Sequence, residues 1–258
     1  MNTRELSDKY AKSDDERLLI AKIYDLVRFA DDRHTVCFSS FLTPYEQTLL
    51  KKVSEFKNYA NINFDGGYAD AERRIAVVMP LGFETEYKVP IIALTINYKG
   101  QRLSHRDILG SVLGLGIKRE TIGDILDQNE PQIVFVAEKM ADFLMQNAKK
   151  AGKAEISLLI ASDDIEISSP NFKEISATVA SLRIDSVISE GFSISRSKAV
   201  DAVKLKRVFL NYVEVSSPSK EVSEGDKISL RGLGKIRLAK VGGKSRKDRI
   251  FVTIERYV

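Results

Sequence analysis

The sequence predicts an α+β protein with a helical N-terminal segment, a ferredoxin-like α/β middle domain and a small α+β C-terminal domain. Apolar residues recur with a helical period near the start of the chain, and strands and helices alternate in its middle. Two short helices followed by strands make up its last part. With 258 residues, the chain is long enough for two or three small domains. We expect domain boundaries at 1–80, 81–180 and 181–258.

The N-terminal segment is expected to contain two helices and a terminal strand. The first helix follows Ser13, which together with Glu16 resembles a capping box. The second helix begins after Thr43, with a proline in its first turn and Glu46 three residues after the cap. A turn then leads into a strand over Arg74–Met79.

The middle domain alternates strands and helices, which indicates a ferredoxin-like unit over about residues 81–165. Its expected elements are a strand at 89–98, a helix at 104–113, a helical or turn stretch from Arg119, a strand at 132–137, a helix at 138–150 and a strand at 155–160. Ser104 is the expected N-cap of the first helix, and Asp107 stands at its third position. A polar stretch and an alternating strand, 163–181, then bridge to the last domain.

A glycine-rich run in the middle domain is a candidate nucleotide-binding loop. Gly110, Gly114 and Gly116 precede a Lys-Arg pair, but the spacing matches neither a P-loop nor a dinucleotide fingerprint. The simplest interpretation makes Gly114 and Gly116 the end of a helix and a turn. We therefore predict no nucleotide cofactor.

The last domain is expected to begin with two short helices. The first spans about 182–192, and Ser195 caps the second, which runs through about Lys206. A strand at 207–215 follows, then a turn and strand at 225–232. A pair of strands ends the chain.

Composition excludes several classes of function. No apolar run approaches the roughly 20 residues that a membrane helix needs, and the N-terminus is too charged for a secretory signal. The single cysteine, Cys37, excludes an internal disulfide, and the presence of only two histidines argues against a His-based metal cluster. We expect a cytoplasmic protein without a metal, a cofactor or a membrane partner.

Positive charge is concentrated at the C-terminal end. Residues 181–258 hold 17 Lys and Arg against 9 Asp and Glu, whereas the rest of the chain is mildly acidic. A basic module on an acidic body is the electrostatic pattern of nucleic-acid binding. A charge run can also be a merely solvated face, and that alternative stays open for either basic cluster alone.

The basic residues form two clusters. The first surrounds the second helix of the last domain, where residues three or four apart share a side and the helix N-terminus leaves N–H groups for a phosphate. The second lies in the last strand pair, where Gly242 and Gly243 indicate a mobile hairpin. The predicted RNA-binding residues are Arg183, Ser195, Arg196, Ser197, Lys198, Lys204, Lys206, Arg207, Lys235, Arg237, Lys240, Lys244, Arg246, Lys247 and Arg249.

The last domain resembles the alpha-L RNA-binding module of small-subunit ribosomal protein four. The matching positions, over nearly all of 182–234, are Arg183 and Asp185, Ser195-Arg196-Ser197, Asn211, Pro218-Ser219 and Gly225-Asp226. One departure is Tyr212, because the family usually has glycine after the asparagine. This departure concerns the tightness of that turn.

The remaining segments resemble the YlmH family of bacterial RNA-binding proteins. The resemblance rests on "FLTPYEQ" at 41–47, "FDGGYADAERRIAVVMP" at 64–80 and "SHRDILGSVLGLGIKRETIGDI" at 104–124. It implies an RRM-like middle domain and a non-catalytic protein, and we expect the protein to be a monomer. The implied partners are rRNA and tRNA on the large ribosomal subunit, in the rescue or quality control of stalled translation. A secondary link to cell division is also implied.

Two other functions stay open. The alpha-L module also occurs in RNA-modifying enzymes, although neither a pseudouridine synthase motif nor a good methyltransferase loop is present. The acidic N-terminal helices could instead serve a division scaffold. A possible secondary RNA surface in the first two domains comprises Arg73, Arg74, Arg106, Lys118 and Arg119.

Overall fold

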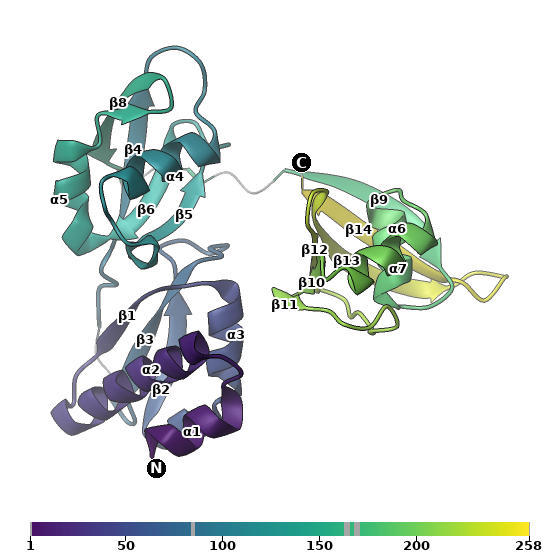
Figure 1. Ribbon diagram of the computed structural model, residues 1–258, viewed down its shortest axis with the longest axis horizontal. Helices are drawn as coiled ribbons and strands as arrows, with labels where there is room; N and C mark the ends of the chain where they lie inside the picture. The colour runs from purple at the N-terminus through teal and green to yellow at the C-terminus, as the bar shows by residue number, and fades with distance from the viewer. Residues whose placement is uncertain (1, 84–85, 163–165, 168–170, 258) are drawn as a thin grey trace. The chain divides into compact units, whose positions relative to one another are not determined.

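The protein is described by a computed structural model that covers residues 2–83, 86–162, 166–167 and 171–257 (Figure 1). It divides into two compact units, Met1–Ser168 and Ser169–Val258. The α+β class is confirmed in both units. The further division of the first unit at residue 80 stays a prediction, and part of the predicted polar linker lies outside the described residues.

The N-terminal part of the first unit combines helices with a three-stranded antiparallel sheet of order β1-β3-β2. Its elements are α1 (Thr3–Tyr10), α2 (Asp14–Arg33), β1 (Cys37–Leu42), α3 (Pro44–Lys52), the 3-10 helix η1 (Ser54–Asn58), β2 (Ala60–Asp65) and β3 (Arg74–Pro80). Ser13 and Thr43 cap their helices as predicted, and Thr43 forms a full capping box with Glu46. Glu16, in contrast, accepts from the backbone N–H of Lys12.

Strand β3 is buried on both faces of this sheet. Ala76 and Val78 pack with Ile20, Ile23 and other apolar residues of the helices, whereas Val77 packs on the opposite side. The sequence predicts only one of these three strands, β3, whereas β1 and β2 were not predicted. Strand β1 pairs with β3 across more than 30 residues, whereas β2 and β3 form a local hairpin in which Asp65 pairs with Ile75.

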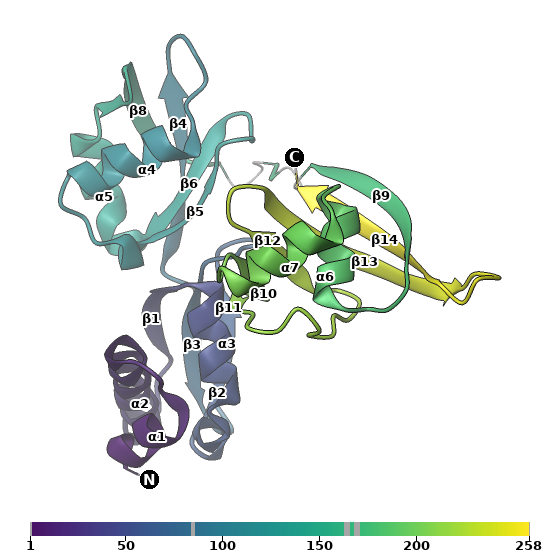
Figure 2. The same ribbon diagram turned by 45° about the vertical axis from the view of Figure 1, so that its right-hand side comes forward.

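The middle part of the first unit is ferredoxin-like, as predicted. Its elements are β4 (Ile91–Tyr98), α4 (His105–Gly114), the 3-10 helix η2 (Arg119–Thr121), β5 (Ile122–Leu126), β6 (Gln132–Ala137), α5 (Glu138–Asn147), β7 (Lys150–Ala151) and β8 (Ala154–Ile160). The antiparallel sheet has the order β5-β6-β4-β8-β7. Helices α4 and α5 lie on one of its faces (Figure 2). Their buried residues Ile108, Val112 and Leu144 belong to the core between the helices and the sheet.

The glycine-rich run ends a helix, as the spacing predicted. Ser104 and Asp107 form a capping box at the start of α4, and the helix closes at Gly114. Gly116 has a φ of 78°, a left-handed conformation that glycine adopts without strain. A Cβ at Gly110 or Gly114 would meet nothing within 4 Å, so neither position requires a glycine for close packing.

The carboxylate of Asp124, on β5, connects the ferredoxin-like part of the first unit to its N-terminal part. Asp124 accepts hydrogen bonds from the Tyr68 hydroxyl at 2.9 Å and from the backbone N–H groups of Glu72 and Arg73 at 2.6 and 3.1 Å. The Tyr68 ring stacks on Phe135 with ring centroids 4.9 Å apart. Burial, followed by the charge of Asp124, raises the pKa of the Tyr68 hydroxyl.

Two arginines beside this carboxylate donate to backbone carbonyls. Arg73 reaches the carbonyls of Ile122, Phe41 and Arg119 at 2.9, 3.3 and 3.3 Å. Arg119 reaches those of Ile122 and Gly123 at 2.6 and 3.2 Å. Burial, assisted by the positive charge of Arg73, lowers the pKa of Arg119 to about 10.

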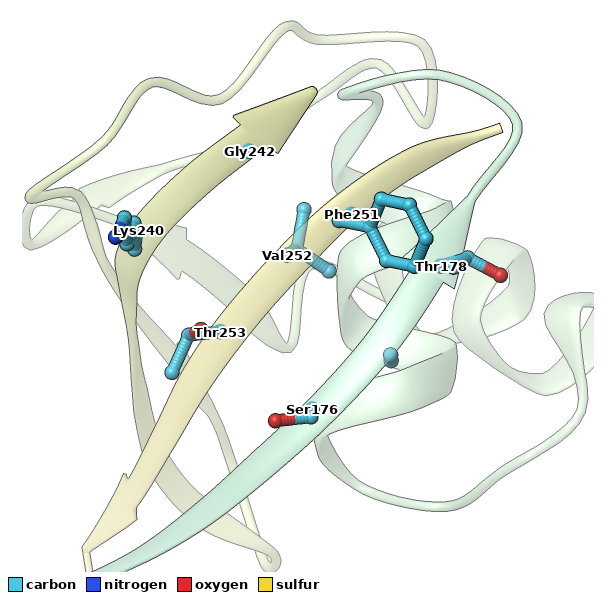
Figure 3. Close-up of a pocket in the computed structure, with 8 residues that line it drawn as sticks. Ser176, Thr178, Lys240, Gly242, Phe251, Val252 and Thr253 are labelled. Atoms are coloured by element: carbon cyan, nitrogen blue, oxygen red, sulfur yellow. The ribbon is translucent and has the colours of Figure 1, made fainter. Parts of the chain in front are cut away.

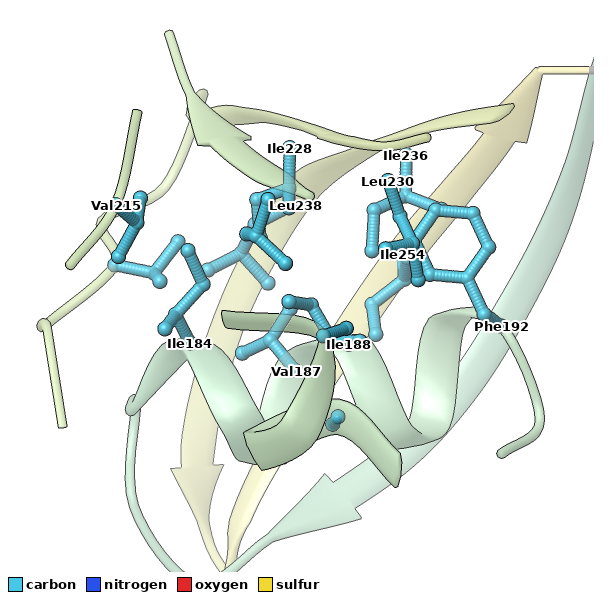
Figure 4. Packing of buried hydrophobic residues seen from close by; sticks show 14 of the residues in the cluster. Ile184, Val187, Ile188, Phe192, Val215, Ile228, Leu230, Ile236, Leu238 and Ile254 are labelled. Carbon is cyan, nitrogen blue, oxygen red and sulfur yellow. The ribbon is translucent and has the colours of Figure 1, made fainter. Parts of the chain in front are cut away.

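The second unit is a six-stranded antiparallel sheet covered on one face by two helices. Its elements are β9 (Phe172–Val179), α6 (Ile184–Gly191), α7 (Arg196–Lys204), β10 (Val208–Leu210), β11 (Val213–Glu214), β12 (Lys227–Leu230), β13 (Gly234–Lys244) and β14 (Ile250–Tyr257). The strand order is β11-β10-β12-β13-β14-β9. Side chains of Val187, Ile188, Ile236, Leu238 and Ile254 fill the space between the helices and the sheet (Figure 4).

The second unit begins before the predicted boundary at residue 181. Strand β9, which the sequence analysis assigned to the bridge before the last domain, pairs with β14 along its whole length. Ile175, Ala177 and Val179 point into the same core as α6. The partner strand lies more than 70 residues further along the chain, so no local signal identifies this pairing.

Candidate nucleic-acid interface

A tight connection joins α6 to α7. Ser193 has a φ of 54°, and the Ile194 N–H donates to the Ser189 carbonyl at 3.0 Å. The Ser189 hydroxyl donates to the Ile194 carbonyl at 2.7 Å. A Cβ at Gly191 would lie 2.6 Å from Cδ1 of Ile236 and 3.2 Å from Cγ2 of Ile254, so a larger residue there would force these buried side chains to shift. This connection sets the N-terminus of α7 beside the start of α6.

A buried carboxylate organises two arginines at this end of the helices. Asp185 is 1% exposed and accepts hydrogen bonds from Arg183 at 3.2 and 3.1 Å and from Arg196 at 3.2 Å. The arginine side chains stay 39% and 53% exposed. One carboxylate thus serves two guanidiniums, so the cluster is net positive and keeps N–H groups available to solvent or a ligand.

Two opposed effects act on the Asp185 carboxyl. Burial alone would raise its pKa, but the hydrogen bonds and charges of Arg183 and Arg196 outweigh burial, and the pKa is lowered. The group is therefore ionised at neutral pH, where it holds the guanidiniums in place.

The N-terminus of α7 extends this cluster. The Ser195 side chain accepts from the Lys198 N–H at 3.3 Å, and its hydroxyl lies 3.0 Å from that of Ser197. Ser195 is therefore the N-cap, as predicted. The side chains of Arg196, Ser197 and Lys198 are exposed. Helix N–H groups, two hydroxyls and cations together form a surface suited to a phosphate.

The turn that carries the departure from the alpha-L pattern is nevertheless tight. Asn211 and Tyr212 have φ values of 47° and 68° between β10 and β11. The Asn211 amide donates to Asp226 at 2.7 Å and accepts from the Lys227 N–H at 3.0 Å. These bonds hold the left-handed conformation although tyrosine replaces glycine.

Three more predicted cations lie at the C-terminal end of α7. Lys204 is exposed, Lys206 pairs with Glu214 at 3.6 Å, and Arg207 donates to the Arg231 carbonyl at 2.7 Å. Lys206 and Arg207 are exposed as well. This group therefore presents charge on the surface, and internal contacts engage two of its members.

The predicted cations of the last strands lie apart from the helices. Ile236 and Leu238 point into the core, so their neighbours Lys235 and Arg237 face the other side of the sheet. Arg237 pairs with Glu255 at 2.6 Å, whereas Lys240 is exposed. The fifteen predicted residues therefore do not form one continuous surface.

The hairpin between β13 and β14 holds the remaining four predicted residues. Lys244 pairs with Asp248 at 2.8 Å, while Arg246 and Lys247 are exposed. Arg249 donates from Nε to the Thr178 hydroxyl at 2.9 Å. Because these cations sit at a hairpin tip, they are accessible to a polyanion.

Most residues of the predicted secondary RNA surface donate hydrogen bonds within the first unit. Arg73 and Arg119 hold the carbonyls described above, and Arg74 donates to two more. Arg106 and Lys118 are exposed. A role of these five residues in RNA binding stays a prediction.

Sequence reasoning omitted several residues that the structure places at these surfaces. Asp185 was noted only as part of a pattern, although its position among apolar helix residues signalled burial. Arg231 and Phe209 were not named at all, and Arg231 lies over the Phe209 ring at 4.8 Å; the predicted Lys235 lies over Tyr212 at 5.7 Å. Each pair joins residues more than 20 positions apart in the chain, so the linear sequence carries no signal for these contacts.

The structure offers no metal centre and no membrane helix within the residues it describes. No group of three or more His, Cys, Asp or Glu is placed there to hold a metal ion. None of the helices described is long and apolar enough to cross a bilayer.

Two family models match this architecture. The S4 domain model matches residues 182–228, which contain the α6–α7 pair and the Asp185 cluster. A model described as "Putative RNA-binding domain in YlmH" matches residues 83–163, the ferredoxin-like part. Together they define a protein with two modules of RNA-binding type.

Similar proteins identify the family. The chain is 34% identical over 251 residues to the "Ribosome-associated protein quality control protein P2" of Bacillus subtilis (strain 168), covering 94% of this chain and 95% of the relative. A solved structure, "Cell division protein ylmH from Streptococcus pneumoniae", matches 60% of this chain and 96% of its own at 24% identity, with a TM-score of 0.49. On the sequence evidence, the chain belongs to the YlmH family.

Proposed function

We propose that the protein binds rRNA and tRNA on the large ribosomal subunit and acts, without catalysing a reaction, in quality control or rescue of stalled translation. The proposal is supported by the S4 and YlmH domain matches and by the name of the Bacillus subtilis relative. The observation that carries it is the buried Asp185, which directs Arg183 and Arg196 to the surface beside the N-terminus of α7.

The expected mechanism is electrostatic and shape recognition. A-form RNA hides its major groove from side chains, so phosphate and 2′-hydroxyl contacts dominate binding to structured RNA. Arg196 and Lys198 would contact successive phosphates from one helix end, while Asp185 keeps the guanidinium of Arg196 in one orientation. Binding of this kind stabilises one state of the ribosome and makes or breaks no bond.

Charge reversal at α7 tests this function. Arg196→Glu combined with Lys198→Glu replaces two exposed cations, and we expect the variant to fold but to leave the ribosomal fractions in sedimentation. Crosslinking with sequencing of the bound RNA identifies the RNA in contact with the wild-type protein. The matched control is Lys52→Glu with Lys57→Glu, which reverses two exposed cations of the first unit. The proposal would be overturned if the α7 variant and the control variant co-sedimented equally with ribosomes and if added salt did not change this result.

A further inference from the structure

The face of the second unit's sheet that the helices leave open carries an exposed aromatic ring. Val252 and Ile254 of β14 point into the core under α6, so Phe251 and Thr253 point the other way. Phe251 is 51% exposed, which is a large apolar surface to leave in water. A single exposed ring is common on protein surfaces, so the neighbours of Phe251 on this face decide whether it marks a binding site.

Strand register surrounds this ring with hydroxyl groups. Thr178 of β9 lies opposite Phe251, and Ser176 lies opposite Thr253. With Lys240 and Gly242 of β13 these residues line an open hollow of about 580 Å³ (Figure 3). The hollow therefore presents one aromatic ring, three hydroxyls and an ammonium group on one rigid sheet.

A glycine keeps one flank of the ring uncovered. A Cβ at Gly242 would lie 3.2 Å from the Phe251 Cβ and 3.4 Å from its carbonyl oxygen. Gly242 has an ordinary backbone conformation, so a larger residue there would be opposed by crowding against Phe251 and not by its φ. The small residue on β13 leaves room for a flat group beside the ring.

The charges around the hollow favour an anion. Lys240 is exposed and has no acidic partner within 4 Å among the described residues. Arg249 holds the Thr178 hydroxyl and lies 4.0 Å from Glu190, a contact too long to neutralise it fully. The acids of the same face, Glu255 and Glu174, lie opposite each other further along the strands, and Arg237 pairs with Glu255.

The same face repeats this pairing of ring and cation elsewhere. The guanidinium of Arg237 lies 5.4 Å from the Phe172 ring centroid, and that of Arg231 lies 4.8 Å from the Phe209 centroid. Aromatic rings interleaved with cations along a sheet are the chemistry that binds single-stranded nucleic acid, because bases stack on the rings while cations follow the phosphates.

We propose that this face of the sheet binds an unpaired segment of RNA, with one base stacked on Phe251. Thr178, Ser176 and Thr253 would then reach the edge of the base or the ribose 2′-hydroxyl, and Lys240 would meet a phosphate. A duplex keeps its bases stacked internally, so it would have to unstack a base step, at a cost in free energy, before a base could lie on Phe251. The inference rests on the proposed function in that the ligand is RNA, but it uses the face opposite to α6 and α7.

The absence of tryptophan from the chain gives a direct test. Phe251→Trp places a single fluorescent indole at the centre of the hollow and preserves an aromatic face. We expect a short oligouridylate to quench this fluorescence on binding and a blunt RNA duplex to quench it much less. Leu18→Trp, an equally exposed position on α2, is the control and should not be quenched. Equal quenching at both positions, or none at Phe251→Trp, would overturn the inference.

Two substitutions separate stacking from charge. Phe251→Leu keeps an apolar side chain without a ring, and we expect it to weaken oligouridylate binding by about tenfold, the loss of one base–aromatic stack. Lys240→Gln should lower the slope of log affinity against log salt by about 0.7, the value for one phosphate of a single strand. Unchanged affinity in both variants, each verified as folded by circular dichroism, would count against the site.

The outcome distinguishes this inference from the proposed function. If the α6–α7 surface alone binds RNA, Phe251→Leu still sediments with ribosomes, Arg196→Glu with Lys198→Glu does not, and Phe251→Trp shows no quenching. That result would overturn only the inference. If both surfaces act, Phe251→Trp is still quenched by oligouridylate when Arg196 and Lys198 are reversed.

Discussion

Two aspartates, one in each unit, lie beside arginine pairs but use them in opposite ways. Asp124 accepts hydrogen bonds from two backbone N–H groups and a tyrosine, and its neighbouring arginines are turned inward onto carbonyls. Asp185 accepts from the arginines themselves, which stay exposed at the end of two helices. The carboxylate's partners thus decide whether nearby arginines join parts of the fold or present charge to a ligand.

The largest expected effect comes from neutralising the buried carboxylate of the second unit. Asp185→Asn leaves Arg183 and Arg196 without a counter-ion. Breaking a buried pair costs about 3–5 kcal/mol, and partial exposure of both arginines reduces this to about 2 kcal/mol. Urea unfolding followed by circular dichroism measures the loss. RNA affinity of the folded variant should fall as well, because the guanidiniums lose their fixed orientation.

The same substitution in the first unit sharpens the contrast. Glu72 and Arg73 donate to different oxygens of Asp124, so Asp124→Asn leaves one of these two N–H groups facing an NH2 group, and we expect a stability loss of about 1–2 kcal/mol. RNA affinity should not change. An affinity loss equal to that of Asp185→Asn would show that the first unit's arginines also serve RNA, contrary to the comparison.

Removing the guanidinium of Arg73 tests the role of the arginines that donate to backbone carbonyls in the first unit. Arg73→Gln withdraws donors from three carbonyls, and we expect the first unit to lose about 1–2 kcal/mol in thermal or urea unfolding. Ribosome co-sedimentation of the folded variant should match the wild type. Arg196→Gln is the matched variant. Compared with Arg73→Gln, we expect it to lower the free energy of unfolding less and to reduce co-sedimentation with ribosomes more.

Acid should weaken the second unit through Asp185. Its pKa is lowered in the folded state, so its contribution to stability is complete above the unfolded value of about 3.9 and is lost as the pH falls further toward the folded pKa. Urea midpoints measured from about pH 7 down to about pH 3 should therefore drop less steeply in Asp185→Asn than in the wild type. Parallel curves would contradict the assigned role of the carboxylate.

The smallest effect on stability is expected at the hairpin tip. Lys244 and Asp248 are both exposed, so Lys244→Gln should change the free energy of unfolding by less than about 0.5 kcal/mol. If this hairpin contacts duplex RNA, the salt slope should nevertheless fall by about 0.9. A slope equal to that of the wild type would remove the hairpin from the interface.

Local signals in the sequence were sufficient to predict several helices and their N-cap residues. Ser104, Ser195 and Thr43 were identified as N-caps because a capping side chain contacts residues only three positions away. The alternation of elements was likewise sufficient for the ferredoxin-like part. Strands β1 and β9 were not assigned to their sheets, since antiparallel pairing across long segments leaves no local pattern. Strand β2 was also missed, although it forms a local hairpin with β3.

The composition of the candidate site could be predicted only in part. Charge and the alpha-L pattern identified the basic residues, but not which of them share a surface. That depends on the register of β13, which sends Ile236 and Leu238 into the core and Lys235 and Arg237 to the opposite face. The candidate site around Phe251 could not be predicted from the sequence, because its other residues come from β9 and β13.

The salt dependence of RNA binding tests the central claim most directly. Arg196→Gln with Lys198→Gln removes two cations from the end of α7 while Asp185 keeps its bond to Arg183. For the full chain binding a structured rRNA fragment, the slope of log affinity against log salt should become shallower by about 1.8, the release of counterions from two phosphates. A slope identical to that of the wild type would contradict the assignment of this helix end to RNA.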